Sequence, residues 1–146
     1  MLKVLLICVS ALLFAQSLAA QGRFPSLDSD STWSMRFTFS YDGKIYTNQL
    51  DSKRLETSPE WDLGKTDPPL TPTRAAAVAK EHLTKLIKIP FRWDVQSIEL
   101  VRAFEKNWFY SVKFGCVWPG CKTTGSFNIL VKMNGSAVDP TVEKEK

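Results

Sequence analysis

The chain has 146 residues, with 19 Lys and Arg against 15 Asp and Glu, a net charge of +4 and one histidine. Charges of both signs are interspersed rather than gathered into a basic stripe, which argues against nucleic-acid binding. The single histidine, His82, excludes a metal site or proton relay that needs two histidines of one chain. The glycines are scattered and form no phosphate-binding loop, so the sequence predicts no cofactor and no metal.

Residues 1–20 predict a cleaved secretory signal peptide. Lys3 supplies a basic start, residues 4–14 are apolar apart from Ser10, and Ser17 and Ala19 are the small residues that precede a cleavage site. Cleavage is expected after Ala19 or Ala20, giving a secreted or periplasmic protein, and the alternative is an uncleaved N-terminal anchor. No later apolar run approaches the ~20 residues that span a bilayer, so the mature form is expected to have no membrane span.

The three cysteines reduce to one pair once the leader is removed, because Cys8 lies inside it. In an exported chain, Cys116 and Cys121 are predicted to form a disulfide across a loop that contains a Pro-Gly turn. The alternatives are a reduced thiol pair, a redox or metal pair, and a nucleophile–base pair of Cys116 with His82.

Residues 21–70 are predicted to hold a β-hairpin and a linker. Residues 35–41 alternate apolar and polar side chains, and Asp42-Gly43 is a strong signal for a two-residue turn. Such a turn pairs Tyr41 with Lys44, Phe39 with Tyr46, and Met35 with Leu50. Residues 51–70 form a linker that Trp61 and Leu63 are expected to hold against the body as an ordered crossover, with a functional loop as the alternative.

One helix is predicted after Thr71, a good N-cap that is followed by Pro72 at the first helical position. Pro90 is expected to end it. The apolar residues recur at three- and four-residue steps, as on a helix that packs on a sheet: Ala75, Ala76, Ala79, Leu83, Leu86 and Ile87.

Three strands are predicted next, over residues 95–104, 108–114 and 127–133. Asn134-Gly135 predicts a second hairpin with a short last strand around Ala137 and Val138, and residues 142–146 are expected to be a solvated tail. The predicted fold class is α+β, a single helix packed on an antiparallel sheet in the order β-β-α-β-β-β. Residues 71–146 would form one compact domain with the hairpin.

The stretch from residue 71 to about 142 resembles the PepSY-like domains, which have a cystatin-like fold. The similar features are the Thr71-Pro72 helix start, the Trp-Phe-Tyr-Ser-Val strand over 108–112, and the closing strand and glycine turn over 130–138. The family occurs in propeptides of secreted metallopeptidases and in small exported proteins. The resemblance therefore implies binding or inhibition rather than catalysis.

The aromatic residues suggest where a partner would bind. Trp118 lies in the tight cysteine loop, where an exposed indole would suit a protein or sugar partner, although core packing is the alternative. With Phe109 it forms the predicted binding surface for a protein or peptide, for example by strand addition. The competing hypothesis is a small-ligand or glycan site on the concave sheet face.

The chain is not expected to be an enzyme. Two acidic pairs that could serve glycoside hydrolysis, Asp28 with Asp30 and Glu60 with Asp62, lie in predicted coil and have no evident partner geometry. The sequence does not indicate an oligomeric state.

Overall fold

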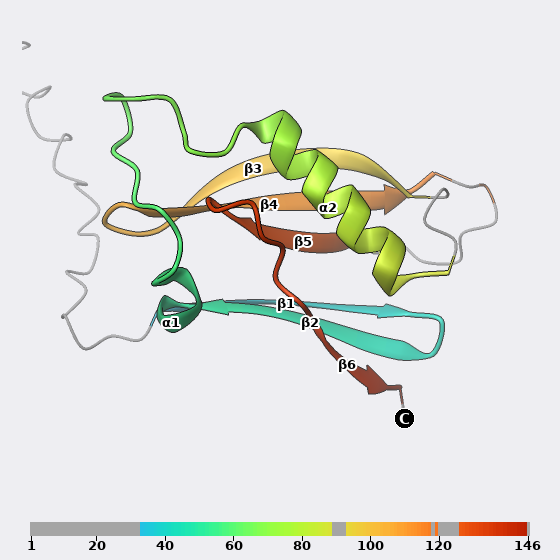
Figure 1. Ribbon diagram of the computed structural model, residues 1–146. Coiled ribbons are helices and arrows are strands. Elements are labelled where there is room, and N and C mark those ends of the chain that lie inside the picture. Colours follow the sequence, from blue (N-terminus) through green and yellow to red (C-terminus); the bar gives the residue numbers. More distant parts are fainter. Residues whose placement is uncertain (1–32, 89–92, 118, 120–125, 146) are drawn as a thin grey trace, which may run out of the picture. The chain divides into compact units, whose positions relative to one another are not determined.

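Two antiparallel three-stranded sheets and two helices make up the part of the chain that the computed structural model describes, residues 33–88, 93–117, 119 and 126–145. The elements in chain order are β1 (Ser34–Tyr41), β2 (Lys44–Asp51), α1 (Ser52–Leu55), α2 (Pro72–Leu86), β3 (Trp93–Phe104), β4 (Asn107–Cys116), β5 (Ser126–Lys132) and β6 (Thr141–Lys144) (Figure 1). One sheet has the order β1-β2-β6 and the other β3-β4-β5. The α+β class is confirmed, whereas the single sheet, the single helix and the predicted β-β-α-β-β-β order of elements are wrong.

The β1–β2 hairpin has the predicted register. Tyr41 pairs with Lys44, Phe39 with Tyr46 and Met35 with Leu50. Asp42 and Gly43 both have positive φ, of 52° and 67°, as a type I′ turn requires. The alternation also holds, because Phe39, Tyr46 and Leu50 are buried.

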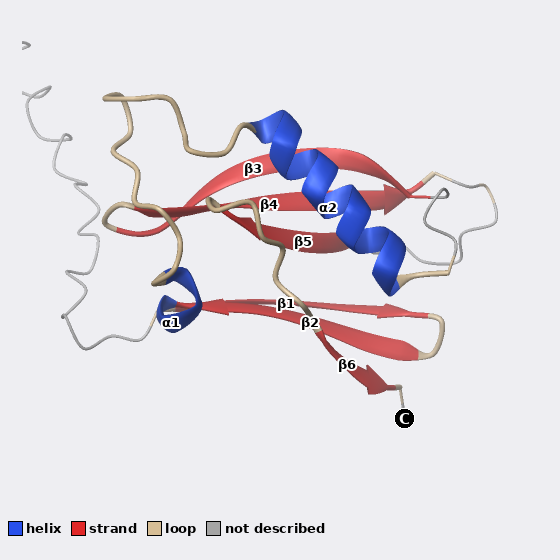
Figure 2. Cartoon of the chain, in the orientation of Figure 1, coloured by secondary structure: helices blue, strands red, loops and turns tan. Residues whose placement is uncertain are grey.

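α2 begins as predicted, with the Thr71 side chain accepting a hydrogen bond from the Arg74 backbone N–H at 3.3 Å. It ends at Leu86, and Pro90 lies outside the described residues. Ala75, Ala79 and Leu83 form its buried stripe. Figure 2 shows the helix lying across β3, β4 and β5. In the described residues, no helix is both long and apolar enough to span a bilayer.

β4 is the central strand of its sheet and is buried on both faces. Tyr110, Val112 and Phe114 belong to the larger core, which includes the buried stripe of α2. Phe109 belongs to a second core, with Leu50 and Leu55 from the hairpin and α1. The concave sheet face that the glycan-site hypothesis needs is therefore covered over β4.

The chain turns back onto β5 after Asn134-Gly135 as predicted, but the short last strand expected around Ala137 and Val138 is reduced to a single bridge. After Asn134-Gly135, one bridge joins Val131 to Ala137, and the chain then crosses to the other sheet. There β6 pairs antiparallel with β2, from Lys44 opposite Lys144 to Thr47 opposite Thr141. The tail is solvent-exposed as expected, but it is an edge strand rather than a free end.

Truncation of Leu83 tests the packing of α2. Leu83 is 1% exposed in the larger core, so Leu83→Ala is expected to lower the free energy of unfolding by about 2–5 kcal/mol. Urea denaturation followed by tryptophan fluorescence measures this. Lys80→Ala, at an exposed position of the same helix, is the control and should change stability by less than about 0.5 kcal/mol. Equal effects of the two substitutions would contradict the packing described.

Candidate functional site

β3 forms an open edge of the β3-β4-β5 sheet. It is twelve residues long and pairs with β4 on one side, and with no other strand in the described part of the chain. The opposite edge, β5, is covered. The Asn48 side-chain amide donates to the Asn128 carbonyl at 2.6 Å, and the Val138 N–H donates to the Leu130 carbonyl at 2.9 Å. Of the two edges of this sheet, β3 is therefore the one with backbone groups available to another chain.

Two irregularities bound a regular stretch in the middle of β3. The pairing with β4 shifts between Val95 and Ser97 and again between Arg102 and Phe104. At the first shift, the Gln96 side chain lies over Gly115 in the space that a Cβ there would need, so a larger residue at position 115 would require the Gln96 side chain to move. Ser97–Arg102 pairs continuously with β4 and is the stretch on which another strand could align.

Apolar side chains are exposed within this stretch. Ile98 and Leu100 are each 37% exposed, whereas Trp93 and Ala103, near the ends of β3, are 2% and 8% exposed. Ile98 lies opposite Val112 and Leu100 opposite Tyr110, so both occur on the sheet face that packs on α2. The helix leaves this outer row of the face partly uncovered.

The opposite face of the same stretch carries an acidic group. Glu99 lies opposite Ser111 and is exposed, and its carboxylate accepts a hydrogen bond of 3.4 Å from the Ser97 hydroxyl. Within the described residues, no ion pair involves Glu99; the acidic partners of those pairs are Asp42, Asp62, Glu81 and Asp139.

The other charged groups of β3 are engaged locally. Arg102 donates from Nε to the Glu105 carbonyl at 2.6 Å, and its guanidinium lies 5.6 Å from the Trp108 ring centroid, within cation–π range. The Asp94 carboxylate accepts from the Val95 N–H at 2.9 Å. Glu99 is therefore the charge of this edge that is best placed to meet a partner.

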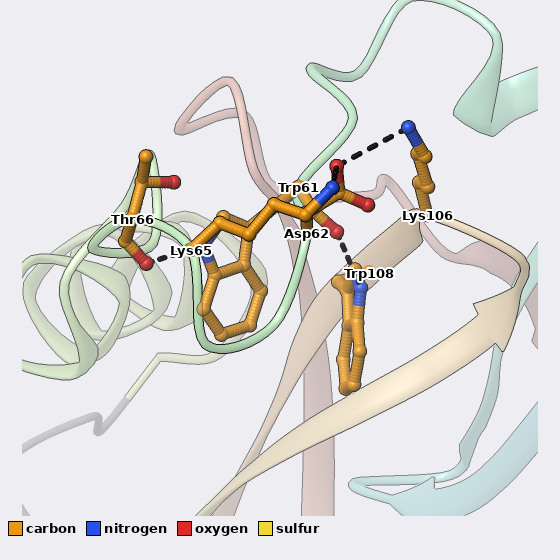
Figure 3. Close-up of polar contacts among 6 residues, drawn as sticks. All are labelled: Trp61, Asp62, Lys65, Thr66, Lys106 and Trp108. Atoms are coloured by element: carbon orange, nitrogen blue, oxygen red, sulfur yellow. Dashed lines mark hydrogen bonds and ion pairs between the residues drawn. The ribbon is translucent and has the colours of Figure 1, made fainter.

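The segment between α1 and α2 packs beside the β3–β4 turn. The Trp61 backbone N–H donates to the Lys106 carbonyl at 2.9 Å. The Trp108 indole N–H donates to the Trp61 carbonyl at 3.0 Å (Figure 3). The two indole rings pack at 64° with centroids 5.3 Å apart. As predicted, Trp61 holds this segment to the body, but Leu63 is 67% exposed and does not.

Asp62 strengthens the same attachment. Its carboxylate lies 3.2 Å from the Nζ atoms of both Lys65 and Lys106, and hydrogen bonding to Lys106 and then Lys65 lowers the pKa of Asp62 (Figure 3). Glu60 is exposed. The Glu60–Asp62 pair considered for glycoside chemistry therefore contains one carboxylate that is already held by two ammonium groups. Asp28 and Asp30 lie outside the described residues.

The structure tests only some of the residues that were predicted to bind a partner or to form the disulfide. Phe109 is 0% exposed and packs against Trp33, so its assignment to an exposed binding surface is wrong. Cys116 ends β4 opposite Trp93. Trp118 and Cys121 lie outside the described residues, so the exposed indole and the disulfide between Cys116 and Cys121 stay predictions.

His82 lies on α2, near the segment between β5 and β6. Its side chain is 13% exposed, and its Nε2 atom is 3.6 Å from the Asp139 carboxylate, without a hydrogen bond. Burial lowers the pKa of His82, and the Asp139 charge opposes that shift. Within the described residues, no three His, Cys, Asp or Glu side chains are grouped so as to hold a metal.

The open edge was not identified from the sequence, although strand addition was among the expected binding mechanisms. The available signal was the charge on this strand, since Asp94, Glu99 and Arg102 mark an edge more than a centre. A surface pocket of about 560 Å³, lined in part by Lys53, Arg54 and Lys132, lies elsewhere.

Comparisons with known proteins identify no relative: no protein-family model matches the chain, and no curated protein or solved structure is significantly similar to it.

Removal of the Trp108 indole N–H tests the attachment of residues 56–70. Trp108→Phe leaves the Trp61 carbonyl without its hydrogen-bond donor. The free energy of unfolding should therefore decrease by about 1–3 kcal/mol. Hydrogen exchange should show a loss of protection at the Trp61 amide beyond the global change. Trp93→Phe, which alters the aromatic cluster beside β1, is the control and should affect Trp61 exchange only through global stability. Parallel exchange behaviour of both variants would overturn this account.

The lowered pKa of His82 predicts a pH dependence of stability. The unfolded chain, with a histidine pKa near 6.5, binds a proton more readily than the folded chain. The stability of the fold should therefore decrease as pH falls below about 6.5, until the lower folded-state pKa is passed. His82→Gln should remove the part of the stability loss between pH 8 and 5.5 that comes from this histidine. Asp139→Asn should increase the loss of stability at low pH, because the carboxylate that favours protonation of His82 in the folded state is removed.

Denaturant unfolding at several pH values measures the effect. Stability curves for wild type and His82→Gln that run parallel across the range would rule out the His82 contribution.

Proposed function

We propose that the protein is an exported, non-catalytic binding module that pairs an extended segment of a protein or peptide partner with β3. The observation that carries the proposal is the stretch Ser97–Arg102, which pairs regularly with β4 on one side and with no strand of the described residues on the other, and in which Ile98 and Leu100 are each 37% exposed. Strand addition obtains its affinity from backbone hydrogen bonds and its specificity from alternate side chains.

The energetics of such pairing favour weak binding of a short segment. Each cross-strand side-chain pair contributes roughly 0.2–1 kcal/mol, and the peptide loses conformational entropy on ordering. A six-residue segment is therefore expected to bind with Kd values of about 1 μM to 1 mM. A larger partner would add affinity through further contacts.

Export and the nature of the partner are the remaining parts of this proposal. Residues 1–20 act as the signal peptide, with cleavage after Ala19 or Ala20, and Cys116 and Cys121 form a disulfide in the exported protein. Regulation or inhibition of a peptidase is the form of binding that the similarity of residues 71–142 to PepSY-like domains supports.

Substitution of the two exposed apolar residues tests this function. Peptides of seven residues are selected from a displayed library against the mature wild-type protein. Ile98→Lys/Leu100→Lys is expected to weaken the selected peptides at least tenfold, because both apolar contacts are lost. Thr38→Lys/Ser40→Lys is the matched control, with two exposed positions on β1, an edge strand of the other sheet. Fluorescence anisotropy measures binding, and thermal unfolding verifies that both variants are folded.

Backbone methylation of the peptide separates strand addition from other modes of binding. Methyl groups on alternate peptide nitrogens should abolish binding in one of the two possible phases and leave it nearly unchanged in the other, because alternate N–H groups of a strand point to one side. Failure to select any peptide, or peptides that bind equally to both lysine variants, would refute the proposed function.

A further inference from the structure

We propose that the strand which pairs with β3 carries a basic residue between two apolar residues, with the basic side chain opposite Glu99. This inference rests on the proposed function and adds the chemical class of the partner. It follows from the alternation of side chains on β3, from the charge of Glu99, and from the way in which β3 would meet a second copy of itself.

The alternation assigns the three positions to two faces. Ile98 and Leu100 lie on the α2 face, opposite Val112 and Tyr110, whereas Glu99 lies on the other face opposite Ser111. A strand added to β3 repeats this alternation. The residues opposite Ile98 and Leu100 therefore meet apolar side chains, and the residue between them meets the carboxylate.

The charge at this position favours a cation. Direct cross-strand neighbours of opposite charge stabilise a sheet, and like charges destabilise it. In the described part of the chain, the nearest cation on this face by register is Lys113, which lies opposite Ser97 and so is a diagonal neighbour of Glu99. No ion pair joins Lys113 to Glu99 among the described residues. A partner Lys or Arg would occupy the closer, directly opposite position.

The same carboxylate disfavours a second copy as the occupant. An antiparallel β3–β3 pairing that sets Ile98 of one copy against Leu100 of the other also sets Glu99 directly opposite Glu99. The register that best matches the apolar residues therefore places two like charges together. A different chain with a basic residue at this point avoids the repulsion and retains both apolar contacts.

The test uses two synthetic peptides and a charge reversal. The peptides are acetylated and amidated Thr-Ile-Lys-Val-Thr and Thr-Ile-Glu-Val-Thr, titrated against the mature protein at low salt by fluorescence anisotropy. The wild type should bind the lysine peptide about three- to tenfold more tightly than the glutamate peptide. Glu99→Lys should reverse this order. Glu143→Lys, the same change at an exposed position on β6, is the control and should leave the order unchanged.

Other outcomes separate the two proposals. Peptides that bind equally, yet lose affinity in Ile98→Lys/Leu100→Lys, would overturn the charge preference and leave strand addition supported. Absence of binding by these peptides and by any library peptide would overturn both. A wild-type dimer in sedimentation that dissociates in Ile98→Lys/Leu100→Lys would make a second copy the occupant and refute this inference. A preference for lysine that Glu99→Lys does not change would also refute it.

Discussion

Burial of β4 on both faces is the constraint on which the rest of the fold depends. Its side chains alternate between a core shared with α2 and a core shared with the β1–β2 hairpin and α1. Each buried apolar side chain contributes about 1.5–3 kcal/mol relative to exposure, so neither face can be left open. α2 covers one face and the hairpin with α1 covers the other, and Phe39 and Tyr46 of the hairpin also pack into the core shared with α2. This explains why the helix and the N-terminal hairpin are both integral to one unit, Thr32–Lys146.

The two edge strands of that sheet differ in whether other parts of the described chain contact their backbone groups. At β5, the Asn48 side chain and the chain after Gly135 take up backbone groups of the strand. At β3, the described residues supply no such cover, and the attachment through Trp61 and Trp108 is confined to the turn beside it. Open edges promote unwanted pairing, and the two register shifts in β3 are a common means of limiting it.

Local signals explain which parts of the fold could be predicted from sequence. The hairpin register follows from Asp42-Gly43 and a two-residue period, and the helix start follows from Thr71-Pro72, all within a few residues of one another. The second core could not be predicted, because it brings Leu50 and Leu55 against Phe109 from a distant part of the chain. For the same reason, the sequence does not indicate that Phe109 is buried or that the charged tail pairs with β2.

The side chains of β3 differ from those expected of an edge that is protected only against aggregation. If the edge were protected only against aggregation, charged residues would be expected at the positions of Ile98 and Leu100, because many edge strands carry lysine at such exposed positions. These two residues are instead apolar and partly exposed, and the charged residue between them, Glu99, lies on the other face of the sheet. This arrangement resists pairing with an identical strand through Glu99, but it leaves the apolar contacts available to a strand of complementary charge. Protection and recognition are therefore compatible at this edge, because one carboxylate distinguishes the second copy from the partner.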